Sequence, residues 1–219
     1  MTFNFVFNKT FSTNVDRSDR VLEVAEAFGL GLDDKEFVVL KDLAIDIERG
    51  DVIYVTGQSG AGKSIILRQL SEKFAEAGEK VADLDGFDLK DVPLIDQIGK
   101  DLNEALFYLS CAGLNEAYLF IRKPKELSDG QRYRFKLAKL MESKASVWVA
   151  DEFMAILDRE TAKCIAYTVR KMAKKMGATL AVATTHKDML DDLRPNLYIE
   201  KRFREKIKVE RPSFDSEDK

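Results

Sequence analysis

The octapeptide GQSGAGKS at residues 57–64 constrains the fold of this chain more than any other feature. It fits the pattern G-x-x-x-x-G-K-[ST], in which glycines let the backbone curl so that successive N–H groups point at phosphate oxygens. Its flanks agree, because residues 51–56 read as a buried strand and residues 64–77 as a helix with one apolar face, ended by Gly78. A strand, this loop and a helix in sequence predict a nucleotide phosphate site, whereas a glycine-rich turn without ligand needs none of that context.

Two side chains of the loop carry its chemistry. Lys63 is expected to reach the β- and γ-phosphates as a point charge, and the hydroxyl of Ser64 is placed to ligate Mg²⁺. The predicted nucleotide-binding residues of this loop are Gly57, Gln58, Ser59, Gly60, Ala61, Gly62, Lys63, Ser64 and Ile65.

Length and charge limit the classes of protein to consider. A chain of 219 residues suffices for one well-buried α/β domain and is too short for two of ordinary size. The net charge of −3 gives no global basic field for nucleic acid, although a local patch stays possible. The apolar runs fall short of the ~20 residues of a membrane span, and the N-terminus lacks the apolar core of a signal peptide.

The cysteines and the histidine argue against a zinc site. Cys111 and Cys164 lie far apart without C-x-x-C spacing, which is typical of two reduced core thiols in a cytoplasmic protein. His186 is the single histidine of the chain, so a histidine-based metal cluster is not available.

The alternation of apolar patterns along the chain predicts an α/β fold. An antiparallel β start followed by βαβ units indicates a mixed sheet with helices on both faces. Strands are expected near 3–7, 21–25, 37–47, 51–56, 81–84, 146–150, 178–183 and 196–200. Helices are expected near 64–77, 99–112, 128–143, 159–176 and 187–193.

This pattern corresponds to a single domain over residues 1–219. Residues 91–144 are almost wholly helical in pattern and are expected to form a helical subdomain inserted in the α/β core. Residues 201–209 are basic and alternating and could form a final edge strand that accepts a partner. Residues 210–219 are polar and are expected to be a frayed tail.

A second constellation follows the strand at 147–150, where Asp151 and Glu152 stand in succession. An aspartate that ends a strand beside a phosphate-binding loop holds Mg²⁺, directly or through water. Glu152 would then polarise the water that attacks the γ-phosphate. An apolar run ending in two acids is otherwise only a strand end, and the loop at 57–64 is what favours the functional interpretation.

The third motif is LSDGQ at residues 127–131, directly before a predicted helix. A short Ser/Gly turn at a helix N-terminus is an anion site, because free N–H groups and the helix dipole favour phosphate. A plain N-cap would need only Ser128 or Asp129. The position of the motif, one helix before the acidic strand, favours the anion site.

Together these motifs resemble the ABC ATPase superfamily over nearly the full length of the chain. GQSGAGKS resembles its Walker A motif, LSDGQ its LSGGQ signature, VWVADE its Walker B motif with the catalytic glutamate, and AILD at 155–158 its D-loop. Three single residues also match by position. Gln97 occupies the place of the Q-loop glutamine, His186 that of the switch histidine, and Phe28 that of an aromatic ring against adenine.

The resemblance implies an ABC-type ATPase on a mixed-sheet core with an antiparallel β subdomain, and it implies ATP and Mg²⁺ as cofactors. Such domains pair head to tail around two MgATP, so Ser128 and Gly130 would bind the nucleotide of the partner copy. Glu152 would be the general base, and His186 would steady the γ-phosphate. Ser64 and Gln97 would ligate Mg²⁺, and Asp151 would hold it through water.

Each positional match has a plainer alternative. His186 could be a capped surface histidine, Gln97 a polar turn residue and Phe28 a core residue. Four basic residues of the helix at 159–176 read most simply as a solvated face, with a nucleic-acid patch as the alternative. They are Arg170, Lys171, Lys174 and Lys175.

Several departures argue against an ordinary transporter subunit. Asp129 replaces a signature glycine, Phe153 the proline after the acidic pair, and Ala155 the D-loop serine. The interval from Gln97 to Ser128 is short for a groove that receives a membrane subunit. Its apolar residues are expected to be committed to packing; they are Leu102, Leu106, Leu109, Leu114, Leu119 and Phe120.

The pattern from DEF to the proline beyond His186 resembles stand-alone archaeal and bacterial ABC ATPases that are sometimes fused to a predicted acetyltransferase. We therefore expect a cytoplasmic, ATP-dimerising ATPase that acts on an unidentified protein or nucleic acid. Two alternatives stay open. One is the nucleotide-binding subunit of a transporter with a separate membrane permease, and the other is a regulatory switch that binds ATP and hardly hydrolyses it, against which Glu152 argues.

Overall fold

The computed structural model describes residues 1–33, 35–202 and 207–214. The chain forms two compact units, one of residues 1–3 with 47–219 and one of residues 4–46. Among the described residues, no helix is long and apolar enough to cross a bilayer. The organisation of residues 1–219 as a single domain stays a prediction, and the two units are described separately.

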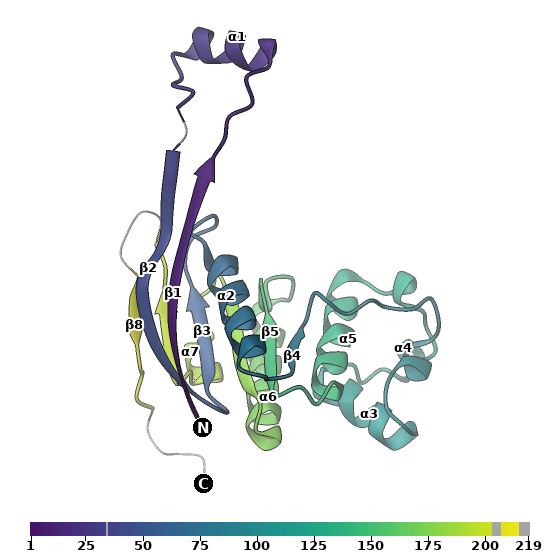
Figure 1. Ribbon diagram of the computed structural model, residues 1–219. Coiled ribbons are helices and arrows are strands. Elements are labelled where there is room, and N and C mark those ends of the chain that lie inside the picture. Colours follow the sequence, from purple (N-terminus) through teal and green to yellow (C-terminus); the bar gives the residue numbers. More distant parts are fainter. Residues whose placement is uncertain (34, 203–206, 215–219) are drawn as a thin grey trace. The chain divides into compact units, whose positions relative to one another are not determined.

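The larger unit is built on a six-stranded sheet (Figure 1). The strand order is β4-β5-β6-β3-β7-β8, and all neighbouring pairs are parallel except β7 with β8. The mixed α/β sheet is therefore confirmed. The strands are β3 (Val52–Thr56), β4 (Val81–Asp83), β5 (Val147–Ala150), β6 (Thr179–Thr184), β7 (Leu197–Glu200) and β8 (Lys208–Glu210).

The predicted edge strand at 201–209 is confirmed in part. Lys208–Glu210 forms the antiparallel edge strand β8, paired with β7. Residues 203–206 of that segment lie outside the described residues, as do residues 215–219 of the predicted tail.

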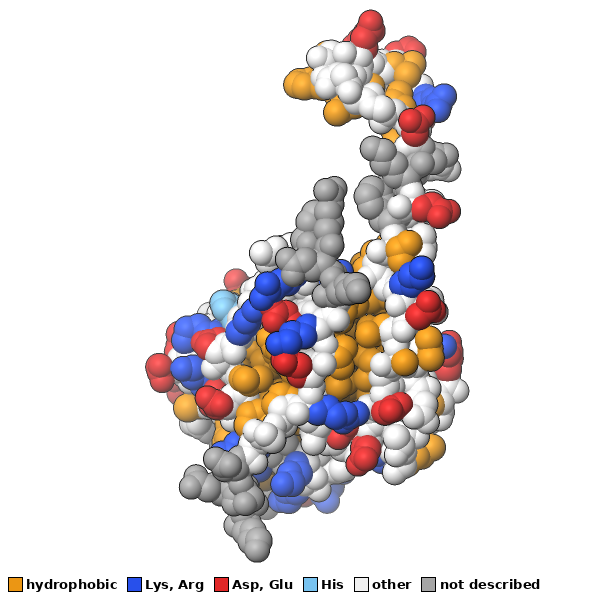
Figure 2. Space-filling model, turned by 90° about the vertical axis from the view of Figure 1, so that its left-hand side faces the viewer, with side chains coloured by type: hydrophobic (Ala, Val, Ile, Leu, Met, Phe, Trp, Pro, Cys, Tyr) orange, Lys and Arg blue, Asp and Glu red, His pale blue; other side chains and the backbone are white. Residues whose placement is uncertain are grey.

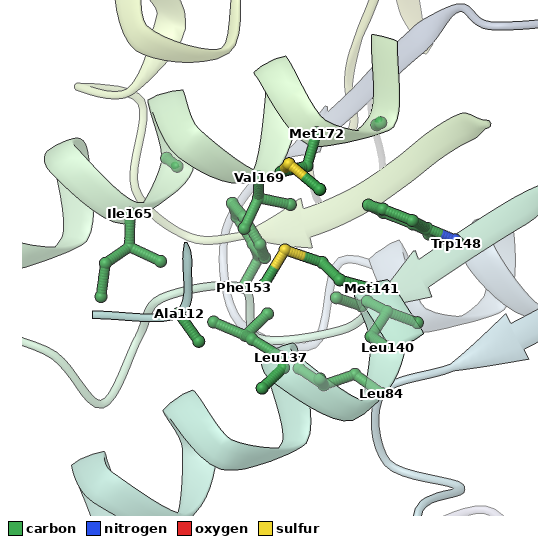
Figure 3. Close-up of a cluster of buried hydrophobic side chains, with 14 of the residues drawn as sticks. Leu84, Ala112, Leu137, Leu140, Met141, Trp148, Phe153, Ile165, Val169 and Met172 are labelled. Carbon is green, nitrogen blue, oxygen red and sulfur yellow. The ribbon is translucent and has the colours of Figure 1, made fainter. Parts of the chain in front are cut away.

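Helices lie on both faces of the sheet. α6 (Arg159–Met176) packs Val169 and Met172 into a core that also holds Trp148 and Phe153 (Figure 3). α2 (Lys63–Glu76) lies against the other face (Figure 1). It buries Ile66, Leu67, Leu70 and Phe74, which recur at helical spacing. A last short helix, α7 (Leu190–Leu193), follows β6.

Residues 91–144 are mainly helical, as predicted. The segment comprises the 3₁₀ turns η1 (Leu94–Gln97) and η2 (Pro124–Glu126) and the helices α3 (Leu102–Cys111), α4 (Ala117–Phe120) and α5 (Asp129–Glu142). Its buried side chains, among them Leu109, Leu114 and Leu119, join the core of α6.

The prediction that six apolar residues of this segment are committed to packing is wrong for Leu102, which is 61% exposed. Ile121, which is 69% exposed, was not part of that prediction. Phe107 and Tyr118, which were not part of it either, are exposed as well. Helical spacing identified the buried face correctly for Leu109, but the helices of this segment are covered on one side only, which leaves apolar side chains at the surface.

The smaller unit contains α1 (Asp19–Phe28) and most of a two-stranded sheet of β1 (Thr2–Thr13) and β2 (Lys35–Glu48). In the sequence α1 connects the two strands (Figure 1). The strand predicted at 21–25 is wrong, because these residues lie in α1. The β-branched Val21 and Val24 favoured a strand locally. Ser18 at the N-cap and Gly29 in the left-handed conformation (φ 61°) delimit a helix that buries Ala25.

The two cysteines are not both core residues. Cys111 is half-buried in α3, Cys164 is exposed on α6, and both are free thiols.

Candidate functional site

The sheet brings three predicted motifs to one edge. β3 runs parallel to β6 and β7, and β5 runs parallel to β6. The carboxyl ends of parallel strands meet at the same edge, which is where ligands bind in such sheets. The loop 57–64 follows β3, the acidic pair 151–152 follows β5, and His186 lies beyond β6.

Glycine is required where the loop 57–64 approaches other backbone. A Cβ on Gly57 would lie 1.9 Å from the carbonyl oxygen of Lys201, so no larger residue fits without a shift of β7 and its continuation. Gly62 has φ 99° and forms the N-cap of α2. Only glycine adopts such a conformation freely. The loop is therefore shaped by its main chain, as a phosphate cradle has to be.

Lys63 bends back over the loop. Its Nζ donates to the carbonyl oxygen of Gln58 at 2.9 Å. Lys63 as a residue is half-buried, and its ammonium group could exchange this carbonyl for a phosphate oxygen.

The turn after β5 is held in an unusual conformation. Glu152 has φ 45°, which is left-handed for a residue with a side chain, and its N–H donates to Oδ1 of Asp151 at 2.9 Å. Such conformations persist only where the surroundings impose them. Here the next N–H, of Phe153, donates to the carbonyl of Ala183 at 2.8 Å. The turn thereby leaves the Glu152 side chain exposed while Phe153 is buried.

Helix α5, which follows the LSDGQ motif, also supports the turn after β5. The hydroxyl of Tyr133 on α5 accepts the N–H of Met154 at 2.8 Å. Burial raises the pKa of Tyr133 above its ordinary value, so the hydroxyl stays protonated. Tyr133 thus joins the acidic turn to the helix that follows LSDGQ. No local sequence pattern indicates this contact, because it depends on how α5 packs.

Two hollows are lined by the acidic turn. The first, of about 230 Å³, contains both Ser64 and Asp151, so two of the predicted metal ligands are brought together. Asp83 and Asp85 line it too. The second, of about 370 Å³, contains Asp85, Asp151 and Glu152 with Tyr133. Neither aspartate was among the predicted site residues, although Asp83 lies in the strand predicted at 81–84 and Asp85 follows that strand directly, before Gly86.

The donor set fits Mg²⁺ that arrives with a nucleotide. Mg²⁺ prefers oxygen ligands and is usually held by one or two carboxylates together with phosphates and water. Ser64 and Asp151 supply a hydroxyl and a carboxylate at the first hollow. Within the described parts of the chain, no group of three or more His, Cys, Asp or Glu side chains could hold a metal by itself.

Gln97 lies in a different setting. It ends η1, and its Oε1 accepts the N–H of Lys90 at 2.9 Å. Its Nε2 donates to the carbonyl oxygens of Lys90 at 3.0 Å and Val92 at 2.6 Å. The amide therefore ties together the turn at 90–97, and Gln97 is not among the residues that line either hollow. Its role as a metal ligand stays a prediction.

His186 is positioned through its main chain. Its carbonyl accepts the hydroxyl of Tyr54 at 2.6 Å, and its N–H donates to Oγ1 of Thr184 at 3.3 Å. The next residue, Lys187, donates to Oε1 of Glu200 at 2.7 Å, and Arg202 donates to the same oxygen at 2.7 Å. These two cations lower the pKa of Glu200 to about 2.

Ser128 is the N-cap of α5. Its hydroxyl accepts the N–H of Gln131 at 3.2 Å, and the Gln131 Oε1 accepts the N–H of Ser128 at 3.0 Å. This capping box satisfies two donors of the helix end. Asp129 pairs with Arg132, so the carboxylate that departs from the usual signature is neutralised locally. At Gly130, a Cβ would lie 3.2 Å from the Leu157 side chain of the predicted D-loop.

Phe28 belongs to the smaller unit. It is the last residue of α1 and is 74% exposed. Exposure of this kind excludes the core alternative, and stacking on adenine stays a prediction.

Comparisons with known proteins agree with this arrangement of motifs. The family profile described as "ABC transporter" matches residues 40–109, which include the phosphate loop. The methionine import ATP-binding protein MetN of Clostridium tetani is 29% identical over 191 residues, and that of Clostridioides difficile is 28% identical over 189. The motifs of this chain and its similarity to these relatives are those of ABC ATPases. Each of these alignments covers 71% of this chain and 59% of the relative, so the chain spans less than two thirds of those proteins.

Solved structures support the fold of this chain. The dimeric ATP-binding cassette MJ0796, bound to ADP and Pi, matches with a TM-score of 0.68 at 18% identity and covers 97% of this chain and 100% of that one. The cbiO1 protein of Clostridium perfringens matches with a TM-score of 0.58 at 19% identity, over 75% of this chain and 80% of that one. At such identities the likeness extends to the fold alone.

Proposed function

We propose that this chain binds MgATP at residues 57–65 and hydrolyses it, with Glu152 as the general base. The observation that carries the proposal is the meeting of Ser64, Asp151 and Glu152 around two adjoining hollows at one edge of the sheet. A base must be near the γ-phosphate and free to accept a proton. The exposed carboxylate of Glu152, held out by a left-handed turn, meets the second requirement.

We further propose that the active form is a head-to-tail homodimer. The N-terminus of α5 with Ser128 and Gly130 would face the nucleotide of the other copy, and His186 would steady the γ-phosphate of its own. Support comes from Ser128, which lies exposed at a helix N-terminus where anions are favoured. The likeness to a dimeric cassette agrees with this at the level of the fold.

The partner whose conformation changes on ATP hydrolysis is proposed to be a molecule other than a membrane permease. The short interval from Gln97 to Ser128 and the altered signature support this. Lys and Arg side chains are interspersed with Asp and Glu on the face shown in Figure 2, in keeping with the net charge of −3. A protein partner is therefore favoured over nucleic acid, which selects a basic stripe.

A transporter subunit is the second candidate, and two observations favour it. The relatives named above are methionine import ATP-binding proteins. In addition, the helical segment exposes Leu102, Phe107, Tyr118 and Ile121. Exposed apolar groups of this size are typical of a docking surface, here for a helix of a permease.

Affinity purification from native cells with detergent-solubilised membranes distinguishes the two. A soluble protein recovered in stoichiometric amount is expected, and Ile121→Glu on the helical segment serves to map the contact. Stoichiometric recovery of a multi-span permease that is lost in Ile121→Glu would replace the first candidate by the second. Exposed Asn103→Glu in the same segment is the matched control.

A further inference from the structure

The turn that follows β4 places an acidic side chain beside Ser64 and Asp151, the residues that are expected to hold Mg²⁺. β4 pairs in parallel with β5, with Asp83 beside Val149, and the N–H of Leu84 donates to the carbonyl of Val149 at 2.8 Å. The chain leaving β4 therefore emerges at the same edge as Asp151. Asp85 stands two residues beyond the end of the strand, at the head of this turn.

Asp85 is shared by the two hollows. It lines the first together with Ser64 and Asp151 and the second together with Asp151 and Glu152. Asp83 lines the first hollow only. Its Oδ1 accepts the N–H of Asp85 at 3.0 Å, so it holds the turn in shape.

The Asp85 carboxylate is free to turn toward a cation. Its side chain is 72% exposed, and Nζ of Lys136 on α5 lies 4.0 Å from Oδ1, beyond hydrogen-bond distance. By contrast, the Gln97 amide is engaged on both its oxygen and its nitrogen by main-chain groups of residues 90–92. A ligand role for Gln97 would require these bonds to break.

We propose that Asp85 is the second carboxylate of the Mg²⁺ site, in the place that the family pattern gives to Gln97. The inference rests on the proposed MgATP site, since the metal arrives with the phosphates. A carboxylate has two consequences that an amide lacks. It strengthens the hold on the divalent cation, and it repels the triphosphate when the cation is absent.

Removing the carboxylate should weaken binding of the cation but strengthen binding of the nucleotide when no cation is present. These opposite changes provide the test. The probe is Mn²⁺, whose free concentration is read by electron paramagnetic resonance, with a non-hydrolysable ATP analogue on the full chain. Asp85→Asn should weaken Mn²⁺ binding to the protein–analogue complex about tenfold. In EDTA the same variant should bind the analogue more tightly than wild type. A merely structural loss would weaken both.

Three variants make the outcome decisive. Asp88→Asn, an exposed aspartate of the same turn outside both hollows, should match wild type. Asp85→Glu, which keeps the charge, should restore Mn²⁺ affinity to within about threefold. Gln97→Ala should leave Mn²⁺ affinity unchanged.

The inference is overturned if Asp85→Asn keeps wild-type Mn²⁺ affinity, or if Gln97→Ala loses it instead. Failure of the proposed function looks different, because wild type would then bind the analogue neither with Mn²⁺ nor in EDTA. Unchanged thermal unfolding of Asp85→Asn excludes misfolding as the cause of any loss.

Discussion

The two helix N-termini of the site, at α2 and α5, differ in how their free N–H groups are satisfied. α2 starts from Gly62, and no side chain of the described residues caps it. α5 starts from Ser128, closes a capping box with Gln131 and carries Asp129 in its first turn. Both helices have 14 residues, so length does not explain the difference.

The comparison indicates a division of labour between them. The end of α2 leaves its donors for an external anion, which is what a phosphate cradle needs before nucleotide arrives. At the end of α5, the capping box occupies two donors, and Asp129 complements the helix dipole. Two of its donors are thus occupied without a ligand, and a phosphate of a second copy would compete with the cap for them.

The largest expected effect is a loss of ATP hydrolysis in a variant that leaves the N-termini of α2 and α5 unchanged. Glu152→Gln keeps α2 and α5 intact and removes the base, so the hydrolysis rate should fall by about 10²- to 10⁴-fold. ATP affinity should stay at the wild-type level, and light scattering with MgATP should show a persistent dimer. Exposed Glu160→Gln is the control. Hydrolysis at the wild-type rate in Glu152→Gln would contradict the assignment of the base.

The second test is aimed at the α2 end. Lys63→Ala removes the cation above the loop, an interaction with a charged group worth about 1.5–3 kcal/mol, so MgATP affinity should fall roughly 10- to 150-fold. Calorimetric titration measures it, with Lys73→Ala farther along α2 as the control. Unchanged affinity would remove the basis for treating the α2 end as the phosphate cradle.

The third test is aimed at the α5 end. Ser128→Arg places a bulky cation at the position expected to face the partner's phosphate, and ATP-dependent dimerisation should weaken about 30-fold, the equivalent of 2 kcal/mol. Binding of ATP to the monomer should not change. Analytical ultracentrifugation compares it with Asn103→Arg, an exposed site on α3. A Ser128→Arg protein that dimerises and hydrolyses normally would leave the α5 end as a plain N-cap.

The smallest expected effect is a loss of folding stability at low pH, which we attribute to Glu200 on β7. The pKa of Glu200 is lowered to about 2 from an ordinary 4.5, by Lys187 and Arg202. Its contribution to stability is therefore complete above about pH 4.5 and is lost as the pH falls toward 2. Because both cations are half-exposed, we expect about 1 kcal/mol.

Urea unfolding of Glu200→Gln checks this value. The variant should be less stable than wild type at pH 7, and the difference should shrink as the pH falls from 4.5 toward 2. Glu210→Gln, at an exposed pair on β8, is the control. A difference that does not depend on pH would assign the cost to packing instead of charge.

The sequence by itself determined the nucleotide side of this protein. A backbone loop that binds phosphate is formed by residues close together in the sequence, so it can be recognised from their spacing alone. Here those residues are the glycines at 57–62, Lys63 and Ser64. The order of the strands and helices of the larger unit was likewise accessible from hydrophobic period. Local preference misled the prediction for residues 21–25, where caps and helical spacing outweigh the β-branched valines.

Only the tertiary structure decided which side chains share the acidic edge. Asp85 reaches Ser64 and Asp151 because β4 pairs with β5, a contact between residues more than 60 positions apart. Tyr133 reaches the turn at Met154 because α5 packs beside it. Gln97 fits the family pattern by position, but its amide is bound by the turn at 90–97. Long-range strand pairing and helix packing set these distances, and a linear spacing rule does not contain them.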